Sequence, residues 1–180
     1  MDFTHAHALT LRALQYVEVA LAHLVGAMAP SDWAALCFVL LLSEAAARLG
    51  MVAYCLVALP GTAAHELAHY LVAWALRAHP ALPSIVPERT SNGWRLGSVR
   101  FVAGPLRSVP IALAPMALAP LSLWWAGATL PRLDLGLSYA LHAWGAATTF
   151  AASLPSRADW TIAAPALCLV GLALAFCWLG

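Results

Sequence analysis

The chain has 180 residues, of which 63% are hydrophobic and only 9% are charged. A soluble domain is typically about 45–50% apolar and about 25% charged, so this chain has too few charges to cover its own surface in water. Composition therefore places it in a lipid bilayer, as a single integral membrane domain. The formal net charge of +1 excludes nucleic acid as an electrostatic partner, because such a partner requires a strongly basic surface.

Apolar segments of helical length follow one another along most of the chain. They cover residues 8–29, 33–47, 51–78, 108–130, 135–156 and 160–180. The last three carry no acidic or basic residue other than histidine, and each provides roughly the 20 residues that a helix needs to cross the hydrocarbon. The first has a polar face and is either a transmembrane or an interfacial helix. We therefore expect an all-α polytopic membrane protein with about six transmembrane helices.

One substantial polar loop, residues 79–107, interrupts the apolar pattern with four prolines and four arginines. Within it, residues 93–102 alternate between polar and apolar as a strand does, which predicts a short strand-like segment. Six of the nine arginines fall on the side of this loop and of the turn at 155–159. The positive-inside rule places that side in the cytoplasm. We expect a multi-pass protein of a prokaryotic cytoplasmic membrane.

The sequence His65-Glu66-Leu67-Ala68-His69 lies within an apolar segment and carries the clearest chemical signal. Positions i and i+4 share a helix face, so the two imidazoles can bind one zinc ion. Glu66 can act as general base on a zinc-activated water. Ionisable groups inside a span are costly and favour a functional interpretation. The alternative is a proton-relay or packing cluster without a metal.

A catalytic zinc ion usually has three protein ligands, and two histidines leave one to be found. Asp159 is favoured, because it interrupts the last two apolar runs on the same membrane face as the His65–His69 half of its helix. His142 is the alternative third ligand, although its mid-helix position is also typical of a hydrogen-bonded core histidine. Asp134, expected on the opposite face, and Glu44 are weaker candidates.

Three segments, in this order, resemble motifs of the site-2 protease family of intramembrane zinc metalloproteases. Residues 64–73, which include the two histidines, resemble its HExxH helix. Residues 103–108 resemble its Ala-Gly-Pro-Leu-x-Asn segment, with Ser108 in place of asparagine. Residues 153–159 resemble its Asn-x-x-Pro…Asp-Gly motif, with the gap between proline and aspartate one residue shorter and Trp160 in place of glycine. The resemblance covers residues 51–165.

This resemblance implies that residues 51–180 form an intramembrane metalloprotease core with three catalytic helices, while residues 1–50 add membrane helices of unassigned role. It implies a Zn2+ cofactor held by His65, His69 and Asp159, with Glu66 as the catalytic base. The expected substrates are transmembrane proteins or peptides cleaved within or beside the bilayer. A strand-like segment at 94–102 is expected to hold the unwound substrate by strand addition. The rival hypothesis is a non-proteolytic membrane protein, either a divalent-metal or proton transporter or a pseudo-protease that binds transmembrane segments.

Overall fold

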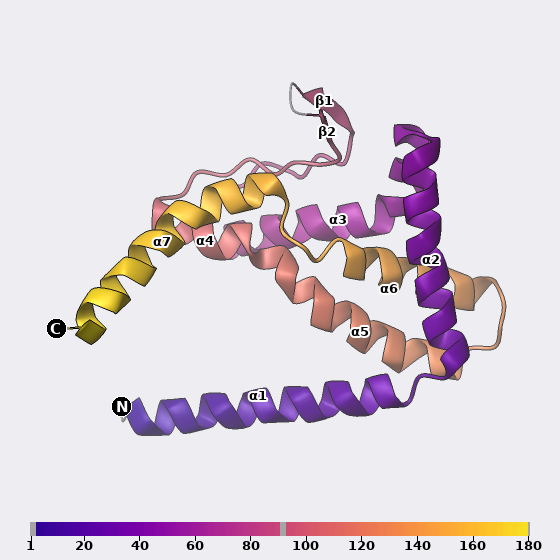
Figure 1. The fold of residues 1–180 in the computed structure, drawn as a ribbon, viewed down its shortest axis with the longest axis horizontal. Coiled ribbons are helices and arrows are strands. Elements are labelled where there is room, and N and C mark those ends of the chain that lie inside the picture. Colours follow the sequence, from indigo (N-terminus) through magenta and orange to yellow (C-terminus); the bar gives the residue numbers. More distant parts are fainter. Residues whose placement is uncertain (1–2, 91–92, 180) are drawn as a thin grey trace.

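The computed structural model describes residues 3–90 and 93–179, and this part of the chain is mostly helical (Figure 1). In chain order the elements are α1 (Phe3–Gly26), α2 (Pro30–Leu49), α3 (Met51–Ala75), β1 (Glu88–Thr90), β2 (Gly93–Arg95), α4 (Pro105–Ala112), the 3-10 helix η1 (Ala114–Ala117), α5 (Leu118–Thr129), the 3-10 helix η2 (Leu130–Arg132), α6 (Leu137–Ala151) and α7 (Arg157–Leu179).

Helices α3 and α6 pack against each other near the middle of the molecule (Figure 1). Helix α2 packs on both of them, α5 packs on α6, and α1 lies along α5. Helix α4 packs against α7 on the other side. In the view of Figure 1 the β1–β2 hairpin is at the top and α1 at the bottom, so α1 is remote from the hairpin.

Two helical segments are long and apolar enough to cross a membrane, namely Met51–Ala75 and Pro105–Arg132. Glu18–Gly26 and Pro30–Leu49 pass the same criterion only as a pair bent by 98°, as a broken span or a re-entrant loop would be. Length and composition of the described residues thus support membrane association through two or three segments. The six crossings expected from the sequence remain a prediction.

The expected apolar segment at 108–130 is interrupted in the structure. It consists of α4, the 3-10 turn η1 and α5, and Pro115 in η1 explains the interruption because proline lacks the N–H that a helix needs. The expected segment at 135–156 is also shorter in the structure. Helix α6 has 15 residues and ends at Ala151, because Pro155 prevents it from continuing into α7.

The largest cluster of buried side chains joins α2, α5 and α6 and includes residues Met28, Leu36, Val39, Ala126, Leu130, Tyr139, Ala143, Ala146 and Ala147. Asp32 is buried at its edge, where the Tyr139 hydroxyl donates to Oδ1 at 2.7 Å and the Ala29 N–H donates to Oδ2 at 2.8 Å. Both carboxylate oxygens are therefore satisfied, as burial requires. The pair ties the first turn of α2 to α6.

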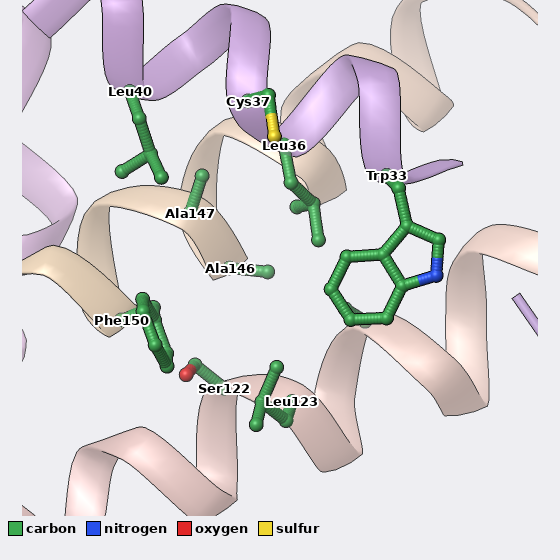
Figure 2. A pocket seen from close by; sticks show the side chains of 10 residues that line it. Trp33, Leu36, Cys37, Leu40, Ser122, Leu123, Ala146, Ala147 and Phe150 are labelled. Carbon is green, nitrogen blue, oxygen red and sulfur yellow. The ribbon is translucent and has the colours of Figure 1, made fainter. Parts of the chain in front are cut away.

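A cavity of about 90 Å³ lies between α2, α5 and α6 (Figure 2). Figure 2 shows Trp33 and Leu36 of α2 facing Ala146 of α6, with Leu123 of α5 across the gap. No histidine or carboxylate lines it. Because the lining is almost entirely apolar, we interpret this cavity as a packing gap between the three helices.

The loop after α3 folds back on itself as a long hairpin. Strands β1 and β2 pair antiparallel with Arg89 opposite Trp94, and Ser84 and Ser98 form a further bridge. Nearer α3, the Val102 N–H donates to the Ala78 carbonyl at 2.9 Å. The strand-like segment expected at 93–102 is therefore present as a short strand followed by extended chain.

Candidate metal centre

Helix α3 brings His65, Glu66 and His69 together at its middle. The two histidines are one turn apart, and their Nε2 atoms lie 3.1 Å from each other. Glu66 and His69 are buried, with 7% and 6% of their surface exposed. A helix crossing fixes this part of α3, because Gly61 packs directly against the Thr148 carbonyl of α6 and leaves no space for a Cβ.

Both imidazole rings are oriented by backbone carbonyls from other helices. The His65 Nδ1–H donates to the Ala152 carbonyl and the His69 Nδ1–H donates to the Ile111 carbonyl, each at 2.7 Å. Because a carbonyl oxygen only accepts hydrogen bonds, Nδ1 carries the proton in both neutral rings. Each Nε2 therefore presents a lone pair, which is the form in which histidine binds a metal ion.

Asp159 completes the group from the first turn of α7. Its Oδ2 lies 3.5 Å from His65 Nε2, and its Oδ1 lies 3.2 Å from His69 Nε2. Ser156 holds this carboxylate in place as the residue before the helix: its N–H donates to Asp159 Oδ2 at 2.6 Å, and its hydroxyl accepts from the Asp159 N–H at 3.3 Å. This is a capping box in which the aspartate occupies the third helical position.

The break between α6 and α7 orients two of the three side chains at once. In a continuous helix the Ser156 N–H would bond to the Ala152 carbonyl, four residues earlier. Instead the carbonyl accepts from His65 and the N–H donates to Asp159. Pro155, within the break, is the residue that prevents the helix from continuing.

His65, His69 and Asp159 can hold a metal ion, with one ligand atom from each lying within 4.8 Å of the others. Two Nε2 lone pairs and a carboxylate are all acceptors, so they repel one another unless a cation lies between them. Ligands arranged tetrahedrally around zinc, at about 2.0–2.1 Å, are about 3.3–3.4 Å apart. The two Nε2 atoms are 3.1 Å apart, and the Asp159 carboxylate lies 3.5 Å from His65 Nε2 through Oδ2 and 3.2 Å from His69 Nε2 through Oδ1. Two imidazoles and a carboxylate at about this spacing fit a zinc ion.

The hairpin passes directly over Glu66. A Cβ on Gly97 would lie 2.6 Å from Glu66 Cγ and 2.7 Å from its Oε1. Glycine at this position is therefore what allows the hairpin backbone to approach the carboxylate. Glu66 is thus enclosed between its own helix and residues 96–98, beside the two histidines.

The other sequence candidates lie apart from this group. The His142 Nδ1–H donates to the Ser138 carbonyl of its own helix at 2.8 Å, and its ring lies 6.0 Å from that of Trp125. Asp134 and Glu44 are both exposed, in the turn before α6 and on α2. In the part of the chain that the structure describes, the Asp159 carboxylate faces the two histidines and forms no ion pair with its neighbour Arg157, which is exposed.

Sequence reasoning did not identify the Ile111 and Ala152 carbonyls or Gly97 as parts of the site. Prolines gave a partial signal, since Pro115 and Pro155 each leave nearby carbonyls without a helical partner. Gly97 has no local signal, because the requirement for glycine comes from a residue 31 positions earlier in the chain.

No family model matches the chain, and neither the curated proteins nor the solved structures include a significant match.

Proposed function

We propose that this protein is an intramembrane zinc metalloprotease, resembling the site-2 protease family, that hydrolyses peptide bonds in or near the transmembrane segments of membrane proteins. The observation that carries the proposal is the convergence of three acceptors, His65 Nε2, His69 Nε2 and an Asp159 oxygen, beside the buried carboxylate of Glu66. Three protein ligands, which leave the fourth position for water or substrate, are typical of a catalytic zinc site.

Each residue then has a distinct role. When bound, zinc supplies a Lewis acid that polarises the scissile carbonyl and acidifies the attacking water. His65 and His69 would hold the ion through Nε2, while the Ile111 and Ala152 carbonyls keep Nδ1 protonated. Asp159 would be the third ligand, and its carboxylate would partly neutralise the charge of the zinc ion. Glu66 takes one proton from the attacking water and delivers it to the leaving amine nitrogen as the C–N bond breaks.

A substrate helix must unwind before its backbone can react, because its carbonyls are engaged in helical hydrogen bonds. The extended chain at residues 93–102 is suited to hold such an unwound segment by strand addition. Its position over Glu66, at Gly97, supports this role because the bound segment would lie next to the catalytic base. We therefore propose transmembrane proteins or peptides as substrates.

The experiment compares Glu66→Ala with Glu44→Ala, which removes an exposed glutamate from α2. Zinc content and cleavage of single-pass transmembrane peptides are measured after reconstitution in lipid. We expect Glu66→Ala to retain stoichiometric zinc and to lose about 10²–10⁴-fold in cleavage rate, the usual contribution of a general base. Glu44→Ala should match the wild type.

Two outcomes would contradict the proposal. Wild-type cleavage by Glu66→Ala would exclude Glu66 as the base. Zinc or proton flux into liposomes, with no cleavage of any transmembrane peptide by the wild type, would instead favour a transporter, which needs the three acceptors but has no need of a general base.

A further inference from the structure

The carbonyl of Ile111 accepts a side-chain hydrogen bond where a helix would normally supply a backbone partner. His69 Nδ1–H donates to it at 2.7 Å, and both residues are buried. In an α-helix the N–H of the residue four positions later would bond to this carbonyl. That residue is Pro115, which has no N–H.

The local structure follows from this missing donor. Helix α4 ends at Ala112, and the chain continues as the 3-10 helix Ala114–Ala117 before α5 begins. Pro115 is fully buried in this turn, and the turn packs against α3, the helix that carries His69. The free carbonyl and the imidazole are thus held against each other by the packing of two elements.

We propose that Pro115 is a positioning residue of the metal centre, acting through the Ile111 carbonyl on the ring of His69. Because Pro115 lacks the N–H of the i+4 position, it leaves the Ile111 carbonyl without its usual α-helical donor and open to Nδ1–H, which fixes the tautomer and turns Nε2 toward Asp159 Oδ1. The inference rests on the proposed metal site but not on peptide hydrolysis.

The same helical run contains two natural controls. Pro110 and Pro120 also lack an N–H, and the carbonyls four residues before them belong to Leu106 and Met116. Both of those residues are exposed, and no described histidine donates to their carbonyls. Replacing either proline with alanine also restores a backbone N–H, but the carbonyl concerned accepts from no described histidine.

The test measures the zinc dissociation constant of the full chain in lipid, by competition with a chelator, for Pro115→Ala, Pro110→Ala and Pro120→Ala. Alanine restores the N–H, which then competes with His69 for the Ile111 carbonyl. We expect Pro115→Ala to bind zinc about 10–100-fold more weakly, as is typical when an outer partner of a ligand is lost. The two controls should stay within about threefold of the wild type. Cobalt(II) in Pro115→Ala should show an altered visible absorption band.

A second measurement needs no variant and therefore does not depend on whether Pro115→Ala folds. Nitrogen-15 NMR of the metal-free wild type, at a pH where the rings are neutral, should show the His69 proton on Nδ1. A proton on Nε2, or wild-type zinc affinity in Pro115→Ala, would overturn the role of Pro115 while leaving the metal site intact. An equal loss in Pro120→Ala would also overturn it, by pointing to general damage. A wild-type protein that binds no zinc would instead refute the metal site itself.

Discussion

The carboxylate of Asp159 performs two tasks with its two oxygens. Oδ2 accepts the N–H of Ser156 and so begins α7, while Oδ1 lies 3.2 Å from His69 Nε2. An exchange of aspartate for asparagine separates these tasks, because an amide oxygen can still cap the helix but carries no charge.

We therefore expect Asp159→Asn to keep α7 folded, to weaken zinc binding by more than the roughly 10–100-fold associated with outer partners, and to abolish cleavage. Circular dichroism measures the helix content, zinc titration measures the affinity for zinc, and a peptide-cleavage assay measures the activity. Arg157→Ala is the matched control, because it removes an exposed charge two residues away and should change stability by only about 0–1 kcal/mol. Full zinc occupancy and activity in Asp159→Asn would exclude Asp159 as the third ligand.

The crossing of α3 and α6 fixes the position of the two histidines relative to α6. Gly61 packs on the Thr148 carbonyl at the crossing, one turn before His65, whose ring bonds to Ala152 at the end of α6. One more turn toward the start of α3, the Trp144 indole donates to the Val57 carbonyl at 2.7 Å. Both contacts depend on the close approach of the two backbones.

A methyl group at Gly61 should separate these helices, since its Cβ would overlap the Thr148 carbonyl. We expect Gly61→Ala to destabilise the protein by about 1–3 kcal/mol, as overpacking typically does, and to weaken zinc binding as His65 moves away from Ala152. Gly171→Ala in α7 is the control, because a Cβ there would meet no atom of the described residues within 4 Å and alanine favours a helix by roughly 0.5–1 kcal/mol. Thermal unfolding and zinc titration of the two variants test this expectation. Equal melting temperatures of Gly61→Ala and Gly171→Ala would contradict the close packing of Gly61 on Thr148.

The sequence anticipates some of these elements and not others, for physical reasons. The spacing of His65 and His69 is local, and arginine counting places Asp159 on the same membrane face, so their grouping can be expected from sequence alone. The prolines at 110, 115 and 120 each free a carbonyl, but only the packing of η1 on α3 selects that of Ile111 for His69. Likewise, nothing near Gly61 in the sequence indicates that its partner is Thr148.

Across the whole molecule, the three residues His65, His69 and Asp159 connect helices that are distant in the chain. His65 and His69 belong to α3 and Asp159 to α7, and the supporting carbonyls come from α4 and the end of α6. A bound ion would therefore stabilise the arrangement of four helices and not only one local turn.

We expect zinc at 100 times its dissociation constant to stabilise the wild type by about 2.7 kcal/mol, which raises the melting temperature by roughly 5–10 °C in a chain of this size. His65→Ala and His69→Ala should lose this increase, because two remaining ligands do not make a tight site. His142→Ala should keep it. Differential scanning calorimetry in lipid, with and without zinc, provides the measurement. A full increase in either α3 variant would contradict the assignment of these histidines as ligands.

The position of Asp159 in α7, after the helices that carry the rest of the site, has a consequence for biosynthesis. A chain emerging from the ribosome presents α3, with both histidines and Glu66, long before α7 exists. Segments of a nascent chain fold in the order of their synthesis, so the first helices can pack while the third acceptor is still missing. Until α7 has been synthesised and the capping box at Ser156 has formed, the nascent chain contains Glu66 and the two histidines but lacks the third acceptor, Asp159. The metal group, and with it the proposed activity, is therefore complete only when α7 is in place.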